Sequence, residues 1–312
     1  MATRNLKDYI FIALKGIAMG AADVVPGVSG GTIAFISGIY EELLETISSF
    51  NLQALKVLTK EGIKPFWKHI NGSFIATLLL GIAISIISLA KLITYLLHAH
   101  TVLIWGFFFG LIVASVFLVG KKVVEWQLSR VLAVIVGTVI AFIITILNPM
   151  ENPDTLWFVF ISGAIAICAM ILPGISGSFI LLLLGSYELI LSSIKDFKII
   201  TILTFGVGCV VGLLSFSKFL NWLFKKYHDI TVAALTGFLI GSLNKVWPWK
   251  EVLSTRENSK GEIVPFIETN VLPNQFHEEP QIMGVIILAL VGFGLIFGLE
   301  KLAKKPANLE ID

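Results

Sequence analysis

VPGVSGGT, at residues 25–32, recurs as LPGISGSF at residues 172–179, and the two prolines are 173 − 26 = 147 residues apart. The same offset holds without a gap on both sides of the motif. It pairs the identical residues Gly16, Ala22, Ile33, Gly38, Tyr40, Glu41, Leu44, Ile47 and Phe50 with Gly163, Ala169, Ile180, Gly185, Tyr187, Glu188, Leu191, Ile194 and Phe197. The chain is therefore an internal duplication organised around this motif.

A second series of identities continues the duplication at an offset of 208 − 81 = 127 residues. It pairs Gly81, Lys91, Leu96, Gly110 and Ser115 with Gly208, Lys218, Leu223, Gly237 and Ser242. The offset falls by 147 − 127 = 20 residues, which predicts a loop insertion of that length around residues 51–71. We therefore divide the chain into a first membrane repeat, 1–150, and a second, 151–312.

The composition places the chain among multi-pass membrane proteins. It is 56% apolar and 14% charged, whereas soluble domains have about 45–50% and about 25%. A net charge of +2 without a basic stripe predicts no nucleic-acid partner. Cys168 and Cys209 lie in apolar runs, and neither they nor the histidines have metal-ligand spacing. We predict no metal and no cofactor.

The expected fold is all-α, with about ten hydrophobic helices in two inverted five-helix repeats. A spanning helix needs about 20 apolar residues. The apolar stretches lie at roughly 8–25, 30–48, 72–97, 101–119, 130–147, 155–172, 177–195, 198–224, 230–247 and 281–300. The stretches at 30–48 and 177–195 follow the motif and contain glutamates, so each is either a span or a re-entrant half-helix.

Lys and Arg indicate the orientation, because they accumulate in short cytoplasmic loops. With Arg4 and Lys7 inside, most of the other basic residues also fall inside, whereas Lys195 and Lys198 do not fit. An odd number of crossings in each half makes the two repeats inverted. Both termini are then cytoplasmic, and a polar, proline-broken loop at about 248–280 lies outside.

The motif residues suit a half-helix that begins inside the membrane. Pro26 and Gly27, with Pro173 and Gly174 in the second copy, disfavour helix before the motif and permit tight backbone turns. The serines Ser29 and Ser176 are typical caps for the helix that follows. The first N–H groups of such a helix carry partial positive charge and favour an anion. The alternative interpretation is a turn between tightly packed helices.

Several charged residues fall within or near the apolar stretches. Glu41 and Glu188 are repeat partners, which indicates either a proton or cation relay or an interfacial position beside Tyr40 and Tyr187. Asp23 has no acidic counterpart, because Met170 stands at the equivalent position. The repeat partners Lys91 and Lys218 either contact an anionic headgroup or extend to the membrane surface.

The run from Asp23 to Thr32, followed by Gly38-Ile39-Tyr40-Glu41, resembles the signature of a bacterial and archaeal membrane family. The family is called PopT, for polyprenyl-phosphate transporter, and was formerly domain of unknown function family 368. The second copy, from Leu172 to Ser178 and on through Gly185 to Tyr187, resembles its second signature. The likeness covers essentially the whole chain except the loop at 248–280.

The resemblance implies a lipid flippase in the plasma (inner) membrane, not an enzyme. Its substrate would be undecaprenyl phosphate, the C55 polyprenyl phosphate carrier of envelope polymer synthesis such as peptidoglycan, returned from the outer to the cytoplasmic leaflet. We expect the phosphate to bind at Ser29, Gly30, Gly31, Thr32, Ser176, Gly177 and Ser178. Asp23, Glu41 and Glu188 would compensate its charge with protons or another coupling cation.

Other classes of function stay open at this stage. A secondary transporter of a soluble anion would use the same site with a closed lateral wall. A membrane protein that binds the lipid phosphate without transporting it would have the same sequence features. A lipid phosphatase usually needs a nucleophile with a base or a metal cluster, and the apolar stretches contain no suitable histidine. The sequence does not determine the oligomeric state.

Overall fold

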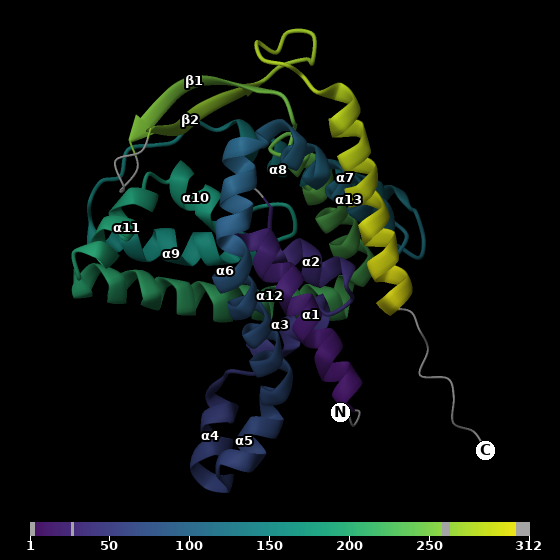
Figure 1. The fold of residues 1–312 in the computed structure, drawn as a ribbon. Coiled ribbons are helices and arrows are strands. Elements are labelled where there is room, and N and C mark those ends of the chain that lie inside the picture. Colours follow the sequence, from purple (N-terminus) through teal and green to yellow (C-terminus); the bar gives the residue numbers. More distant parts are fainter. Residues whose placement is uncertain (1–3, 26–27, 258–262, 304–312) are drawn as a thin grey trace.

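The computed structural model describes residues 4–25, 28–257 and 263–303, which form a mostly helical membrane protein (Figure 1). The helices of the first half are α1 (Leu6–Asp23), α2 (Gly30–Ile36), α3 (Tyr40–Ser48), α4 (Leu52–Glu61), α5 (Ile63–His69), α6 (Gly72–Ala99), α7 (Thr101–Gly120) and α8 (Leu128–Ile146). The second half contains α9 (Leu156–Ile171), α10 (Gly177–Leu183), α11 (Tyr187–Lys195), α12 (Ile199–Ser242), the strands β1 (Lys250–Glu257) and β2 (Ile263–Asn270), and α13 (Ile282–Ala303).

The described part of the chain has fewer uninterrupted spans than the ten that the sequence suggested. Four helices, α6, α7, α8 and α12, are long and apolar enough to cross a membrane, and α10 with α11 adds a fifth if that bent pair is one span. Helix α9 and the segment Ile282–Gly298 of α13 are apolar but shorter. A non-helical residue, Tyr227 (φ −136°, ψ 48°), divides α12 into two helices. Several spans confirm a multi-pass membrane protein.

The two segments that follow the motif are broken helices. Both α2 and α10 have seven residues, so each is about 10 Å long at 1.5 Å per residue. Helices α10 and α11 meet at 105°. The break falls at repeat-partner glycines, Gly38 (φ 75°) and Gly185 (φ 64°), because glycine adopts positive φ without steric cost. Neither segment is a straight membrane span.

Long helices pack in pairs through glycines. Helix α1 packs on α6, and α9 packs on the first part of α12. A Cβ at Gly16 would lie 2.4 Å from the carbonyl oxygen of Leu78, and one at Gly163 would lie 2.5 Å from that of Phe205. Helix α7 packs on α13, and α8 packs on the second part of α12. Small residues allow such close backbone approach, which drives helix association in membranes.

Two segments that the sequence left as loops are regular structure. The inserted residues around 51–71 form the short helices α4 and α5, which project at one end of the molecule (Figure 1). The segment at 248–280 contains an antiparallel hairpin, with Lys250 opposite Asn270. The mostly helical structure is consistent with the predicted all-α membrane fold, but the segment predicted as a polar loop contains this two-stranded hairpin. Two strands that pair satisfy each other's backbone groups outside the apolar helices.

Candidate functional site

The two copies of the motif meet in the structure. The Ser29 hydroxyl donates a hydrogen bond to the carbonyl of Met170 (2.9 Å). The backbone N–H of Gly174 donates to the Thr32 hydroxyl (2.9 Å). Both side chains are fully buried. These contacts join residues 141 and 142 positions apart, so the duplication places its two signatures at one junction.

Packing around α2 makes this junction tight. The buried Tyr40 hydroxyl donates to the carbonyl of Ile171 (3.1 Å). A Cβ at Gly31 would lie 2.4 Å from the same carbonyl oxygen. Glycine is therefore required at position 31 for the close approach of α2 to the end of α9. Pro26 and Gly27, which we predicted to shape the first motif, lie outside the described residues.

The first half-helix already has an anion at its N-terminus. The N–H of Gly30 donates to Oδ1 of Asp23 (2.6 Å), and the N–H of Gly31 donates to the Ser29 hydroxyl (3.0 Å). A carboxylate in this position is stabilised by the helix dipole and by the otherwise unpaired N–H groups. In this conformation the chain's own carboxylate occupies the place that an anionic ligand would take at α2.

Two lysines hold the other end of α2. The ammonium of Lys15 donates to the carbonyl of Ser37 (2.7 Å), and that of Lys122 donates to the carbonyl of Phe35 (3.1 Å). Cations are favourable at a helix C-terminus, where carbonyls lack intrahelical partners. Sequence reasoning missed this role, because Lys122 follows the end of α7 and reaches a residue 87 positions away.

The second half-helix has a different N-terminus. Ser176 accepts a hydrogen bond from the N–H of Phe179 (3.2 Å), and its hydroxyl lies 3.3 Å from that of Ser178. The N–H groups of Gly177 and Ser178 donate to no other described residue, and both residues are only partly buried. Met170 replaces the aspartate here, so α10 lacks the internal anion of α2.

The predicted relay carboxylates lie elsewhere. Glu41 is more than half exposed, and its carboxylate lies 3.5 Å from Nε2 of His228. It begins a row of polar contacts between α3 and α12, which continues with Glu45 and Lys225 (3.0 Å). Glu188 is partly buried on α11. The structure therefore places Glu41 against α12 and brings Asp23 to the motif junction.

Of the remaining predicted residues, some lie at the junction of the two motifs and others lie elsewhere. Pro173 and Gly174 are buried at the junction, and Gly174 has a positive φ of 88°. Lys91 and Lys218 are exposed on α6 and α12. Within the described ranges no group of three His, Cys, Asp or Glu residues is arranged to hold a metal ion.

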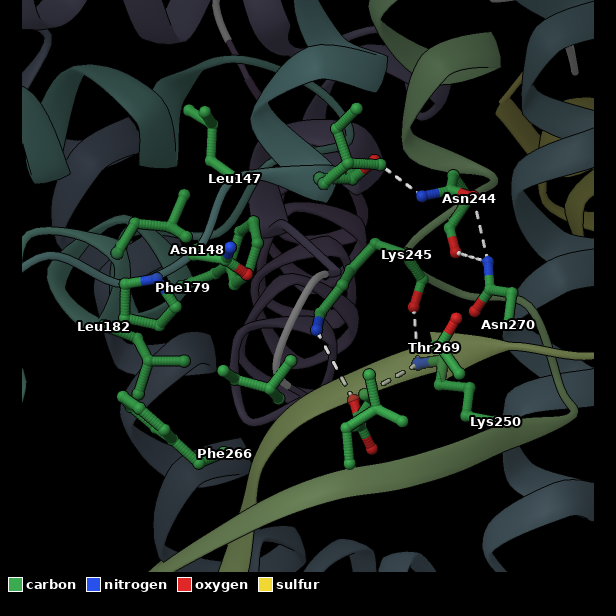
Figure 2. Close-up of a pocket in the computed structure, with 17 residues that line it drawn as sticks. Leu147, Asn148, Phe179, Leu182, Asn244, Lys245, Lys250, Phe266, Thr269 and Asn270 are labelled. Atoms are coloured by element: carbon green, nitrogen blue, oxygen red, sulfur yellow. Dashed lines mark hydrogen bonds and ion pairs between the residues drawn. The ribbon is translucent and has the colours of Figure 1, made fainter.

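A pocket that the sequence did not reveal lies between the hairpin and α10. Its cationic side chains are Lys245 and Lys250 (Figure 2). Burial lowers the pKa of Lys250 to about 7, against the opposing effect of Glu268. Sequence analysis could not find this site, because only the folded hairpin brings strand residues next to the second half-helix.

Broken helices that meet within a multi-pass bundle are a feature of secondary transporters. The family described as undecaprenyl phosphate translocase-like matches residues 19–264. The chain belongs to that family, which confirms the resemblance seen in the motifs.

Two curated relatives are similar over most of their length. The "Polyprenyl-phosphate transporter" of Vibrio cholerae serotype O1 is 51% identical over 302 residues, which are 96% of this chain and 98% of that protein. The "Polyprenyl-phosphate transporter" of Staphylococcus aureus is 32% identical over 253 residues, which are 75% of this chain and 85% of that protein. No solved structure matches the chain.

Proposed function

We propose that this protein transports undecaprenyl phosphate from the outer to the cytoplasmic leaflet of the plasma membrane. Membership of the translocase-like family and the names of both relatives support a polyprenyl phosphate as substrate. The structural observation that carries the proposal is the open N-terminus of α10, where two N–H groups have no partner among the described residues.

The substrate explains why such a site is needed. A phosphate monoester carries about −1.5 to −2 charges near pH 7, so its headgroup cannot cross hydrocarbon alone, whereas the prenyl tail can stay in lipid. Each negative charge moved inward against an inside-negative potential costs about 2.3 kcal/mol per 100 mV. Transport therefore needs both a polar site within the membrane and compensation of charge.

The phosphate binds first at the N–H groups of Gly177 and Ser178, with the hydroxyls of Ser176 and Ser178 as further donors. Gly30 becomes available once Asp23 withdraws from α2, and Ser29, Gly31 and Thr32 complete the second half of the site once their contacts with the end of α9 and with Gly174 also separate. Protonation of Asp23 would release Gly30 and offset one negative charge of the substrate. Glu41 and Glu188 are further candidates for carrying a proton or another coupling cation.

Alternating access follows from an inverted repeat of two halves, 1–150 and 151–312. The pairing of the helices supports an inverted repeat, because the repeat partners Gly110 and Gly237 make equivalent helix contacts. A Cβ at Gly110 of α7 would lie 1.9 Å from a carbonyl of α13, and a Cβ at Gly237 of α12 would lie 2.2 Å from a carbonyl of α8. The repeats exchange these helix partners, as expected for a two-fold arrangement.

The proposed orientation places both termini in the cytoplasm and the hairpin outside. The basic residues of α4 and α5 support it, because lysines accumulate in short cytoplasmic segments. These helices lie at the opposite end of the molecule from the hairpin (Figure 1). Cysteine labelling in whole cells tests this orientation: Lys60→Cys should be protected from an impermeant reagent, and Thr269→Cys should be labelled.

Reconstitution tests the function. Purified protein in liposomes should redistribute undecaprenyl phosphate between leaflets, and Ser176→Ala with Ser178→Ala should slow this at least tenfold. Ser88→Ala is the matched control, since this exposed hydroxyl only bonds its own helix at Ile84. Wild-type protein that binds the lipid without redistributing it would refute transport. Undiminished transport by the double variant would refute the site.

Inhibition separates lipid from soluble-anion transport. Excess inorganic phosphate should not abolish transport of the lipid, because the prenyl tail contributes binding free energy that the free anion lacks. Complete inhibition at millimolar phosphate, with uptake of the free anion, would identify a soluble-anion carrier instead.

A further inference from the structure

The pocket between the hairpin and α10 has a volume of about 340 Å³ and two unlike walls. Figure 2 shows Leu147, Phe179 and Leu182 on one side. Lys250, Asn244 and Asn270 lie on the other. An apolar wall facing convergent polar groups is typical of a site for an amphipathic ligand.

Lys250 is a buried cation aimed into this pocket. Its side chain is only 6% exposed. The ammonium donates to the carbonyl of Lys245 (2.7 Å) and lies 3.8 Å from the ring centre of Trp105. The nearest carboxylate, that of Glu268, is 4.0 Å away. A buried ammonium has three donors, so Lys250 retains two that no described residue accepts.

Lys245 supplies a second cation with spare donors. Its ammonium lies 3.6 Å from the Glu268 carboxylate and 4.7 Å from the ring centre of Phe179. It donates a hydrogen bond to no described residue. Two ammonium groups therefore share one carboxylate, and the pocket has an excess positive charge that a second anion would neutralise.

We infer that this pocket is a receiving site for a prenyl phosphate, in which the phosphate group binds between Lys245 and Lys250 and displaces Glu268. The first isoprene units lie against Phe179, Leu182 and Leu147. Two ammonium groups match the charge of a phosphate dianion, and the apolar wall distinguishes a lipid headgroup from free phosphate. The inference deepens and rests on the proposed function, which it extends to a site on the outer side.

The position of the pocket fits delivery to the half-helix. The Lys245 ammonium lies over the ring of Phe179. Phe179 belongs to the first turn of α10 and donates its N–H to Ser176. The pocket and the open N-terminus are thus on one seven-residue helix. The hairpin covers one side of the pocket. The Asn270 side chain connects the hairpin to the end of α12 by donating to the carbonyl of Asn244 (2.8 Å). A lipid admitted beneath the hairpin has a short path to α10.

Binding to the purified protein in detergent tests the site. Farnesyl phosphate, farnesol and inorganic phosphate are titrated calorimetrically. Farnesyl phosphate should bind at least tenfold more tightly than either other probe. Lys250→Met and Lys245→Gln should each weaken it about tenfold, since each removes one charge-assisted contact. The control Lys198→Gln, an exposed lysine beside Asp196, should have no effect.

Glu268→Gln should change the affinity for farnesyl phosphate in the opposite direction. It removes the anion that competes with the ligand, so affinity for farnesyl phosphate should rise several-fold. A purely structural role for Glu268 would instead lower it. Equal binding of inorganic phosphate would leave an anion site without lipid preference and overturn the inference. Unchanged affinity in folded Lys250→Met and Lys245→Gln would also overturn it, with folding verified by melting temperature.

Transport measurements separate this inference from the proposed function. If wild-type protein moves the lipid and Ser176→Ala with Ser178→Ala does not, while Lys245→Gln with Lys250→Met binds and transports normally, the pocket fails and the function stands. If wild-type protein binds farnesyl phosphate in this pocket but moves no lipid, the transport function fails and the pocket stands.

Discussion

Asp23 is the residue at which the two halves of the site differ most. Its carboxylate accepts from Gly30 at the N-terminus of α2 (2.6 Å), whereas Met170 at the equivalent position leaves α10 without an anion. Both half-helices begin with N–H groups that have no acceptor within the helix. The single difference between Asp23 and Met170 gives the N–H of Gly30 an acceptor and leaves the equivalent N–H of Gly177 without one. Under the proposed function, this asymmetry gives the phosphate one preferred first position.

The Asp23 carboxylate should couple transport to protons. We expect Asp23→Asn to keep a hydrogen-bond acceptor for Gly30 but to abolish acceleration of transport by a pH gradient. Asp23→Ala should in addition lower stability by about 1 kcal/mol, because the N–H of Gly30 loses its acceptor. Liposome transport with and without a gradient measures the first effect, and melting temperature measures the second.

Asp8→Asn provides the control, since Asp8 caps α1 on the surface through the N–H of Asn5 (2.8 Å). Retention of the full gradient response by Asp23→Asn would remove Asp23 from the mechanism. If Glu41→Gln with Glu188→Gln then abolished the response, the coupling would belong to the glutamates.

Lys250 gives the receiving pocket a pH dependence of known sign. Burial lowers its pKa to about 7 in the empty pocket, with Lys245 acting in the same direction and Glu268 opposing. An arriving phosphate favours the charged ammonium and raises this pKa, so binding is fully favoured below about 7 and weakens as pH rises above it. Below about pH 6 the phosphate itself gains a proton.

The affinity for farnesyl phosphate should therefore peak between about pH 6 and 7 and fall by up to about tenfold per pH unit above 7. Calorimetric titrations from pH 5.5 to 9 measure this profile. Lys250→Met should lose the decline above pH 7 while it keeps the decline at low pH. A decline at high pH that persists in Lys250→Met would assign it to another group.

At the scale of elements, helix packing depends on glycines that occupy equivalent places in the two repeats. Gly110→Ala would place a Cβ 1.9 Å from the carbonyl of Ala289, in backbone that cannot yield without moving α13. We expect a loss of about 1–3 kcal/mol, the usual cost of overpacking. Melting of the purified protein in detergent measures it.

Gly294→Ala is the matched control on the same helix pair, because a Cβ there meets nothing within 4 Å. It should leave the melting temperature unchanged or raise it, since alanine favours helix over glycine by up to about 1 kcal/mol. Equal destabilisation by both variants would show that the contact between α7 and α13 is not what Gly110 permits.

Elements copied by the duplication were predictable from sequence. The offset of 147 residues relates α2 (Gly30–Ile36) to α10 (Gly177–Leu183) and α3 (Tyr40–Ser48) to α11 (Tyr187–Lys195), residue by residue. The hairpin and α4 with α5 lie outside the matched series, so the repeat carried no information about them. Apolar periodicity also does not show a break such as Tyr227, where one long run becomes two helices.

Long-range contacts account for the rest of what sequence could not show. The motif predicted caps at Ser29 and Ser176, and both are present. The lysine contacts at the end of α2 and in the receiving pocket arise from packing between distant segments. Lys122 and Lys250 look like ordinary loop residues in the sequence, because their contacts are decided only by the tertiary fold.

At the scale of the whole molecule, the two repeats are not in the same state. Helix α3 packs on α12, where Asn221 donates to the Ser48 hydroxyl (3.0 Å) and Lys225 pairs with Glu45 (3.0 Å). The equivalent packing would be α11 on α6, and no comparable contact exists between these described helices. In the proposed orientation, the contact between α3 and α12 lies on the cytoplasmic side, and its repeat counterpart on the outer side is absent among the described helix contacts.

Alternating access then requires the two contacts to exchange, which cross-linking can detect. In a Cys168→Ser, Cys209→Ser background, Ser48→Cys with Asn221→Cys should cross-link readily without lipid and arrest transport.

The repeat offsets identify the counterpart contact on the other side. They relate Glu41 and His228, which are 3.5 Å apart, to positions 41 + 147 = 188 and 228 − 127 = 101, that is Glu188 and Thr101. Glu188→Cys with Thr101→Cys should cross-link only during turnover, because that contact forms when the outer side closes. Single-cysteine variants control for links between molecules. Equal cross-linking of both pairs without lipid would contradict a two-state exchange, because the two contacts would then exist together and the membrane site would be closed to both leaflets.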